Sequence, residues 1–232
     1  MEISELLNLD IIKYDRNIIE QQSINIEKHQ ILIKKIALHI QPNYKFTNDI
    51  KIILDLFMAY FSGQKNIISE FNKNNKTEIS LSKGILLVGS VGSGKSLIFD
   101  IFKIYTSKVI HKNSFQQYQV GDIIDNLNIK GKIYFEKFSY NRSSNNIPDP
   151  ITCYIDDIAS RNEIVNHYGS VYNSMQELLT IRYNIFSKFR KLTHISTNLY
   201  PNQLKEIYGI RVIDRMKEMF NVVELKGGSF RK

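Results

Sequence analysis

Residues 83–96 read KGILLVGSVGSGKS, and this stretch decides the fold. Ile85 to Val88 form an unbroken apolar run, which is typical of a strand buried on both faces. The segment Gly89–Ser96 fits the pattern G-x-x-x-x-G-K-S/T, and apolar residues then recur at helical spacing from Leu97 to Tyr105. Strand, glycine loop and helix therefore follow in the order that a phosphate-binding loop requires. The alternative is a chance glycine-rich turn, which would require neither a strand before it nor a helix after it.

The loop contains the residue types that hold a nucleoside triphosphate. Its glycines allow backbone N–H groups to converge on phosphate oxygens, and the N-terminus of the next helix adds partial positive charge. Lys95 is placed to reach the β- and γ-phosphates, and the Ser96 hydroxyl is placed to bind Mg²⁺. We therefore expect ATP and Mg²⁺ at this loop, with the nucleotide bound by Gly89, Ser90, Val91, Gly92, Ser93, Gly94, Lys95, Ser96 and Leu97.

A second buried strand is predicted to end in two carboxylates. Ile151–Ile155 is an apolar run, and Asp156 and Asp157 follow it. Because the carboxyl ends of parallel strands meet at one edge of a sheet, we expect Asp156 to hold Mg²⁺ together with Ser96. Asp157 is then the candidate to orient and deprotonate the water that attacks the γ-phosphate. An apolar run with two aspartates is a weak signal alone, and a phosphate-binding loop before it makes the signal strong.

Polar residues also end the next predicted strand, Leu192–Ser196. The amide of Asn198 is placed to polarise the same water, although an asparagine that caps the following turn is the alternative. Between the two strands, Ser170–Phe189 is predicted to be a long helix with an inward apolar stripe of Val171, Met175, Leu178, Leu179, Ile185 and Phe186. The residues after Asn198 are too few for a separate helical lid domain.

The N-terminal part of the chain is predicted to be helical in several pieces. One helix covers Ile26–Ile40, and another covers Asp49–Phe61 with Thr47 as a capping residue. We assign residues 1–45 to a leader and residues 46–232 to the domain that contains the phosphate-binding loop. The leader either docks another protein or packs on the main domain.

The region after the loop helix contains an unusual segment. Phe115–Val120 is predicted to be a strand, with Asp122 as the N-cap of a helix over Ile123–Leu127. The segment Lys130–Pro150 then alternates the cations Lys130, Lys132, Lys137 and Arg142 with the aromatic residues Tyr134, Phe135, Phe138 and Tyr140. Cations and exposed aromatic faces are what single-stranded nucleic acid needs for phosphate contact and stacking. The alternative is a hairpin whose aromatic side chains pack on the core.

The composition favours one domain with an appendage and excludes a membrane-spanning protein. The chain has 232 residues and 43% apolar content, and no apolar run is long enough to cross a bilayer. The lone Cys153 excludes an internal disulfide and suits the reducing cytosol, so we expect a cytoplasmic location. The net charge is +8, and most of the excess lies beyond Arg182, which fits either a DNA partner or a generally basic surface.

Four motifs in order resemble those of the AAA+ ATPases of the DnaC/DnaI helicase-loader and IstB transposition-helper group: GSVGSGKS, YIDD, STN, and GIRVIDRM with a later GGSFR. The resemblance covers roughly residue 48 to the C-terminus. It implies an α/β P-loop NTPase fold of AAA+ type, a three-layer sandwich with a central parallel sheet, no separate C-terminal lid domain, and a helical N-terminal leader. It also identifies the loop with Walker A, Asp156 and Asp157 with Walker B, and Asn198 with sensor 1.

The resemblance further implies roles for two arginines. Arg215, in DRM, matches the arginine finger that a neighbouring subunit supplies, and Arg231, in GGSFR, matches the arginine that replaces a lid-borne sensor 2. The chain also departs from the group. Walker B usually continues there as DDLG with a nearby glutamate, whereas this chain has DDIASRNE, which leaves any role of Glu163 open. The segment Lys130–Pro150 has no counterpart in the group.

Three functions are compatible with these motifs. The lead hypothesis is an ATPase that acts on DNA, helicase-loader-like or transposition-helper-like, with its active site completed between subunits, so that the monomer is slow. It implies three partners: single-stranded DNA, further copies in a nucleotide-dependent oligomer, and a replicative helicase or transposase bound by the leader. The alternatives are a nucleic-acid-binding module that ATP switches with little turnover, and a small-molecule P-loop kinase that uses Arg211, Arg215 or Arg231 as a clamp.

Overall fold

The computed structural model of the chain describes residues 24–141 and 149–226. Three predictions therefore fall outside the described residues: Arg231 with the GGSF residues before it, Arg142 of the aromatic segment, and residues 1–23 of the leader. The predicted boundary after residue 45 stays a prediction. No helix in the described ranges is long and apolar enough to cross a membrane.

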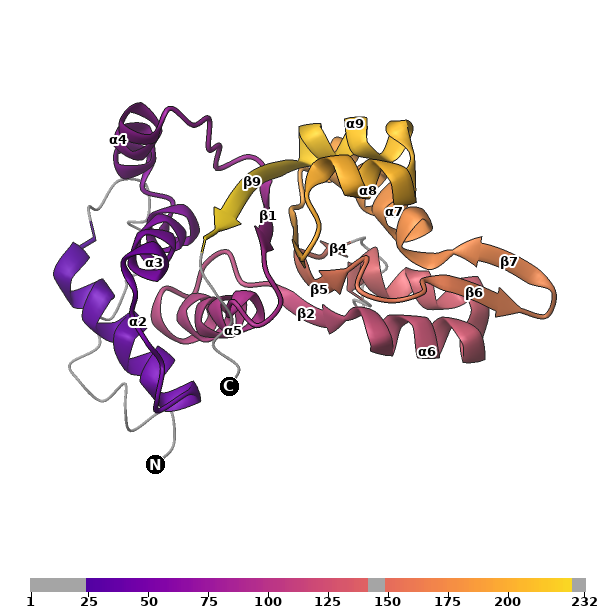
Figure 1. Ribbon diagram of the computed structural model, residues 1–232, viewed down its shortest axis with the longest axis horizontal. Coiled ribbons are helices and arrows are strands. Elements are labelled where there is room, and N and C mark those ends of the chain that lie inside the picture. The colour runs from indigo at the N-terminus through magenta and orange to yellow at the C-terminus, as the bar shows by residue number, and fades with distance from the viewer. Residues whose placement is uncertain (1–23, 142–148, 227–232) are drawn as a thin grey trace. The chain divides into compact units, whose positions relative to one another are not determined.

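The described residues form two compact units, and the first unit is helical. It comprises residues 24–77 and 97–114. Its helices are α2 (Ile26–Ile40), α3 (Asn48–Ser62), α4 (Lys65–Asn75) and most of α5 (Lys95–Ile104), which continues into the π-helical turn η1 (Tyr105–Val109) (Figure 1). The helices predicted from apolar periodicity are confirmed. Thr47 caps α3, because its side chain accepts a hydrogen bond from the backbone N–H of Ile50.

Aromatic side chains fill the core of the first unit. The ring centroid of Phe102 on α5 lies 5.4 Å from that of Phe57 and 5.3 Å from that of Phe61, both on α3. The Nδ1 atom of His29 lies 2.7 Å from the Tyr105 hydroxyl, which joins α2 to η1. Burial lowers the pKa of His29, so this contact involves the neutral ring at neutral pH. The predicted apolar helix faces therefore pack against one another.

The second unit contains a five-stranded parallel sheet. Its strands, in spatial order, are β2 (Gln116–Gln119), β5 (Cys153–Ile158), β8 (Thr193–Thr197), β1 (Gly84–Gly89) and β9 (Phe220–Leu225) (Figure 1). Strand β1 is buried along its whole length, as its apolar run predicts. Position 84 requires glycine, because a Cβ atom there would lie 1.7 Å from the carbonyl oxygen of Thr193 on β8. The predicted α/β fold with a central parallel sheet is confirmed.

Helices follow the strands of the second unit in sequence. They are α6 (Val120–Lys130), the 3₁₀ helix η2 (Gly131–Phe138), α7 (Ser174–Phe189), α8 (Pro201–Tyr208) and α9 (Ile210–Met219). Their apolar side chains form one buried cluster with those of the central strands. The prediction that Asp122 is an N-cap is wrong, because α6 begins earlier and Gln119 is its N-cap. Asp122 lies in the first turn, where a carboxylate still stabilises the helix N-terminus.

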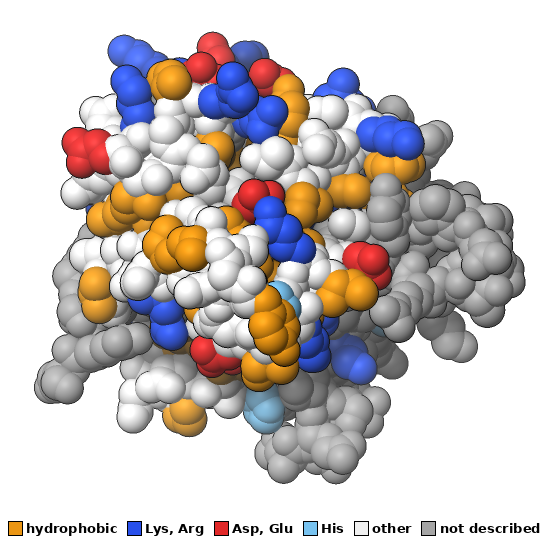
Figure 2. All heavy atoms as spheres, turned by 90° about the vertical axis from the view of Figure 1, so that its right-hand side faces the viewer, with side chains coloured by type: hydrophobic (Ala, Val, Ile, Leu, Met, Phe, Trp, Pro, Cys, Tyr) orange, Lys and Arg blue, Asp and Glu red, His pale blue; other side chains and the backbone are white. Residues whose placement is uncertain are grey.

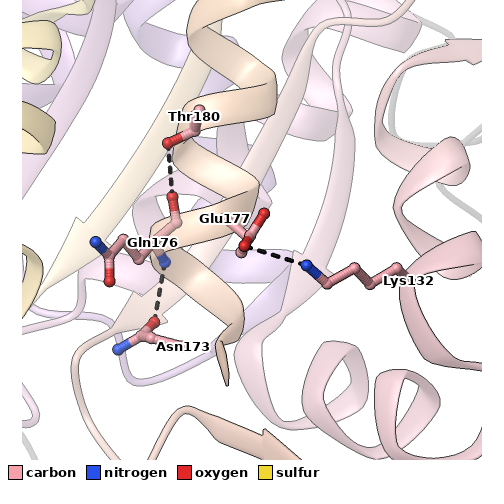
Figure 3. Close-up of polar contacts among 5 residues, drawn as sticks. All are labelled: Lys132, Asn173, Gln176, Glu177 and Thr180. Carbon is pink, nitrogen blue, oxygen red and sulfur yellow. Dashed lines mark hydrogen bonds and ion pairs between the residues drawn. The ribbon is translucent and has the colours of Figure 1, made fainter. Parts of the chain in front are cut away.

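A β-hairpin occupies the start of the predicted long helix. Strand β6 (Ile164–His167) pairs antiparallel with β7 (Ser170–Asn173), and α7 begins only afterwards. Val171, which was predicted to face inward on a helix, is 64% exposed on β7, so that prediction is wrong. Gly169, with φ 82°, makes the turn between the strands, and the side chain of Asn173 caps α7 (Figure 3). The prediction extends the helical spacing of apolar residues from α7 back into the hairpin, where the chain is not helical.

The aromatic segment is largely part of the core. Phe135 and Phe138 are 5% and 0% exposed in η2, so the prediction that they offer exposed stacking faces is wrong. Tyr134 is half-buried against the same cluster. The segment then forms the short strands β3 (Tyr140–Asn141) and β4 (Asp149–Pro150). Packing on the core, which was the alternative for this segment, therefore accounts for its two phenylalanines.

A buried arginine joins η2, α7 and the amino ends of two strands. Arg182 on α7 is 0% exposed. Its guanidinium donates hydrogen bonds to the carbonyl oxygens of Phe138 (2.5 Å), Ile151 (2.8 Å) and Leu192 (3.0 Å), and to Oγ1 of Thr193 (2.8 Å). None of these partners is a carboxylate, so the charge of Arg182 is stabilised by neutral dipoles alone within the described residues.

Candidate active site

The glycine loop lies directly after β1, at the carboxyl edge of the sheet. Gly92 and Gly94 have φ values of 77° and 95°, in the left-handed region that glycine adopts without strain. Between them, the Ser93 hydroxyl is buried and has no hydrogen-bond partner among the described residues. A buried polar atom without a partner in a glycine-rich loop fits a site that binds an external acceptor such as a phosphate oxygen.

The side chain of Lys95 points back into the loop and toward β8. It is 6% exposed, and its Nζ donates hydrogen bonds to the carbonyl oxygens of Gly89 (2.8 Å) and Ser90 (3.0 Å). The same Nζ donates to Oδ1 of Asn198, at 2.6 Å. The structure thus brings together two residues that the sequence assigned to one site from separate strand ends.

Asn198 also contacts the aspartate pair at the end of β5. Its Nδ2 donates a hydrogen bond to Oδ1 of Asp157, at 2.9 Å. The amide therefore lies between the cation of Lys95 and the carboxylate of Asp157, with its oxygen toward the former and its nitrogen toward the latter. A chain of three polar side chains spans the carboxyl ends of β1, β8 and β5. This arrangement uses both ends of the amide, as neither a simple turn cap nor a surface asparagine would.

Asp156 is buried and fixed by hydrogen bonds. Only 3% of it is exposed. Its Oδ1 accepts from the hydroxyls of Tyr154 and Ser196, both at 2.5 Å, and its Oδ2 accepts from Nε2 of Gln119 at 3.1 Å. The sequence analysis missed these three residues. The available signal was the two-residue period of a strand, which places Tyr154 and Asp156 on the same face of β5.

Asp157 differs from Asp156 in exposure and backbone conformation. It is half-buried, and its φ of 64° lies in the left-handed region. For a residue with a Cβ atom this conformation costs about 1–3 kcal/mol, and surrounding contacts must offset it. The pairing of β5 with β8 shifts register between Ile155 and Ile158, so the two adjacent aspartates present their side chains differently. One is enclosed by hydroxyls, and the other reaches the Asn198 amide.

Glu163 lies a few residues further on and is also buried. It is 3% exposed, and its carboxylate accepts hydrogen bonds from the backbone N–H of Ala159 and from the Tyr208 hydroxyl, both at 2.7 Å. Burial raises the pKa of Glu163, and these two hydrogen bonds oppose that rise. Its carboxylate is thus bound inside the protein, to a residue just after β5 and to the last residue of α8.

Two arginines, Arg215 and Arg231, are the remaining residues that the sequence predicts to be catalytic. Arg215 lies on α9, where its Nη1 donates to Oγ1 of Thr180 at 3.2 Å and its Cζ lies 5.1 Å from the ring centroid of Tyr183. The Thr180 hydroxyl in turn donates to the carbonyl oxygen of Gln176, at 3.0 Å (Figure 3). Arg215 therefore contacts α7 of its own chain. Arg231 lies outside the described residues.

The residues present fit Mg²⁺ only together with a phosphate. Among the described residues, no three His, Cys, Asp or Glu side chains are arranged to hold a metal ion. Mg²⁺, however, is commonly held by one or two carboxylates, substrate phosphates and water. Asp156 Oδ2 has a single described donor and so retains acceptor capacity, and Ser96 lies in the first turn of α5, one residue after Lys95. This donor set is of the kind that binds Mg²⁺ with a nucleotide.

A parallel sheet with a GxxxxGKS loop after β1 and polar residues at neighbouring strand ends is a P-loop NTPase fold. No protein-family model matches the chain, and the search of curated proteins finds no match either. Solved structures do match. A candidate primosome component from Streptococcus pyogenes serotype M3 is 17% identical at a TM-score of 0.52, with 85% of this chain and 91% of that chain covered. This identity shows a shared fold alone.

Two further similar structures carry the names of the group that the four motifs resemble. The DnaC helicase loader is 17% identical at a TM-score of 0.48, with 81% of this chain and 96% of that chain covered. DnaI is 13% identical at a TM-score of 0.45, with 100% of this chain and 95% of that chain covered. Their backbone likeness is looser than that of the streptococcal protein.

Proposed function

We propose that this chain binds ATP with Mg²⁺ and hydrolyses it, and that it acts on DNA as a helicase-loader-like or transposition-helper-like ATPase. The observation that carries the proposal is the chain of hydrogen bonds from Lys95 through Asn198 to Asp157. It joins a phosphate-binding cation to a carboxylate by way of an amide, and these are the three groups that γ-phosphate hydrolysis needs near one another.

Each side chain has a defined task in the proposed reaction. Lys95 exchanges its contacts with loop carbonyls for phosphate oxygens. Asp157 and Asn198 orient a water molecule, whose oxygen forms a bond to the γ-phosphorus as the bond from that phosphorus to the ADP oxygen breaks, and Asp157 accepts the proton. Bound by Ser96 and Asp156, Mg²⁺ would neutralise negative charge on the β- and γ-phosphates. The other loop residues from Gly89, and Leu97 after them, hold the nucleotide.

The proposed site is completed by a neighbouring subunit. Arg215 is the proposed finger, and Arg231 is the proposed substitute for a lid-borne arginine. For Arg215 to reach another subunit, its contacts with Thr180 and Tyr183 must open, which is feasible because it is only half-buried. A finger supplied in trans is worth on the order of 10³–10⁵ in rate. The isolated monomer should accordingly be slow.

Calorimetry and phosphate release test the nucleotide part of the proposal. Wild type should take up ATP and ADP in Mg²⁺, and Lys95→Ala should abolish that uptake without unfolding the protein. Arg215→Ala should retain nucleotide affinity but lose the turnover that assembly stimulates. Lys217→Ala is the matched control, since it removes an exposed cation from the same helix. Absence of nucleotide uptake by wild type would refute the proposal, and full turnover by Arg215→Ala would remove the finger.

The DNA part of the proposal has a separate test. Figure 2 shows Lys and Arg side chains dispersed between hydrophobic groups on the face that it presents, not gathered into one basic area. Because the net charge of the chain is +8, we expect affinity for single-stranded DNA that depends on ATP and falls steeply with salt. Sedimentation with a nonhydrolysable ATP analogue should show assembly. DNA binding with negligible ATP turnover would instead identify an ATP-switched binding module. A protein that sediments as a monomer both with and without nucleotide would favour a kinase.

A further inference from the structure

Residues 157–159, where β5 ends and the chain turns, have a backbone conformation that residues with a Cβ atom disfavour, and we call this segment the turn. Asp157 has φ 64° and Ala159 has φ 60°, both in the left-handed region. A turn of this kind persists only where surrounding groups hold it. The direction of the Asp157 carboxylate therefore depends on whatever fixes the residues from 157 to 159.

Two of the groups that hold this turn come from β8. The backbone N–H of Asp157 donates to Oγ of Ser196, at 2.9 Å. The hydroxyl of Thr197 donates to the carbonyl oxygen of Ile158, also at 2.9 Å. Both contacts come from residues of β8, the strand that ends one residue before Asn198, so they keep the turn beside the proposed site.

The third group is the carboxylate of Glu163. Its Oε1 accepts the backbone N–H of Ala159 at 2.7 Å, and its Oε2 accepts the hydroxyl of Tyr208 at the end of α8, at 2.7 Å. Its own carbonyl oxygen accepts from the N–H and the hydroxyl of Ser174, at 2.9 and 2.8 Å. Glu163 is thus fixed at both its main chain and its side chain, and it transmits that fixed position to Ala159.

A carboxylate is an unfavourable choice for a group that only fills space. Removing its charge from water is costly, and no ion pair of Glu163 is recorded within the described residues. A charged acceptor does, however, make a shorter and stronger bond to a backbone N–H than a neutral one. The buried carboxylate is therefore best explained by the turn that it holds.

We infer that Glu163 is a positioning residue, which sets the direction of the Asp157 carboxylate toward Asn198 by holding the backbone of the intervening turn. This inference rests on the proposed ATPase function. Asp157 bonds to Asn198 at 2.9 Å, and a small rotation of the turn would break that contact. The glutamate carboxylate bonds to the backbone of Ala159 and to Tyr208, so its effect on Asp157 passes through the backbone.

Steady-state phosphate release by Glu163 variants tests the inference. Glu163→Ala should lower kcat at least about tenfold while the KM for ATP and the Kd for ADP stay within about twofold, because the nucleotide-binding loop is unchanged. Glu163→Gln should restore kcat to within about threefold of wild type, since its amide oxygen still accepts from Ala159. Glu206→Gln, an exposed carboxylate on α8, is the matched control and should behave as wild type.

The outcomes separate this inference from the proposed function. If wild type hydrolyses ATP and Glu163→Ala has the same kcat, the inference about Glu163 is overturned and the proposed function stands. This holds whatever the melting temperature of the variant. No turnover in wild type would overturn both. Circular dichroism at the assay temperature checks folding. If Glu163→Ala is unfolded there, Glu163→Asp replaces it, because the shorter acid cannot reach Ala159 and Tyr208 together and should show the same loss of kcat.

Discussion

The two ends of the parallel sheet each contain a buried cation, and the two cations are stabilised differently. At the carboxyl end, Lys95 is 6% exposed and donates to two loop carbonyls and to the Asn198 amide. At the amino end, Arg182 is 0% exposed and donates to three carbonyls and one hydroxyl. The acceptors named here are neutral at both ends. The two cations differ in what lies next to them.

The surroundings of the two cations indicate why we assign Lys95 to the candidate site and Arg182 to the protein core. Beyond the Asn198 amide, the Lys95 end continues to the half-buried Asp157, and its loop includes the exposed Ser90. A ligand can replace the contact with the exposed Ser90 without burying an unpaired group. Every acceptor around Arg182 comes from the ends of packed elements, and the arginine occupies them with a fixed fork of donors. An exchangeable cation suits binding, whereas an enclosed one suits stability.

The largest effect should come from removing each cation in turn. Arg182→Met leaves three carbonyls and a hydroxyl without their donor, so it should lower the free energy of unfolding by about 3–5 kcal/mol. Lys95→Met should lower it by less, about 1 kcal/mol, because water can reach at least the exposed Ser90 among its acceptors, yet it should abolish ATP uptake. Urea denaturation measures the first quantity and calorimetry the second. Similar unfolding midpoints for both variants would contradict the comparison.

A smaller effect should appear in acid at the Arg182 end. Burial, and secondly the charge of Arg182, lower the pKa of His194 to about 3, and its Nδ1 accepts the backbone N–H of Ile85 at 3.2 Å. Since the unfolded ring titrates near 6.5, the unfolded state binds the proton more tightly. Stability should therefore fall as pH drops below 6.5, by about 3 kcal/mol at pH 4.

The histidine contribution can be isolated with a variant that does not titrate. His194→Asn keeps an acceptor for the backbone N–H of Ile85 but cannot be protonated in this range. The difference in unfolding free energy between wild type and His194→Asn should therefore change between pH 7 and pH 4, in favour of the variant at the lower pH. A difference that stays constant over this range would show that His194 is not held neutral.

The smallest effect should come from a cation on the surface. Lys132 Nζ lies 3.3 Å from Glu177 Oε1, and the two side chains are 54% and 43% exposed (Figure 3). Water and salt screen such a pair, so Lys132→Ala should change the unfolding free energy by less than about 0.5 kcal/mol. Thermal melts at low and high salt measure it. If Lys132→Ala lowered the unfolding free energy as much as Arg182→Met, burial would not explain the difference between Lys132 and Arg182.

Local patterns predicted the fold and much of the candidate site. Strand β1, the glycine loop and the residues at the ends of β5 and β8 form contiguous stretches, so their meeting at one edge follows from parallel pairing. The hydrogen bond from Lys95 to Asn198 is the kind of contact that this reasoning implies but cannot specify. The roles of these residues in chemistry stay predictions.

The remaining features depend on contacts between distant segments. Arg182 sits in a helix where a sequence pattern reads it as one more surface charge, and only its partners on three other segments bury it. Phe135 and Phe138 alternate with lysines, yet one face of η2 packs on the core. The β6–β7 hairpin was missed because Val171 happens to continue the spacing of α7. Tertiary packing overrode the local signal in each case.

The orientation of the Asn198 amide would depend on whether a ligand is bound in the glycine loop. Its oxygen faces a cation and its nitrogen faces an anion, so these two neighbours select one of its two flipped orientations. A ligand that draws Lys95 away removes one of the two selecting partners and leaves the side chain tethered to Asp157 alone. Rotation about a single side-chain bond would then report occupancy from one strand to the next without any movement of the sheet.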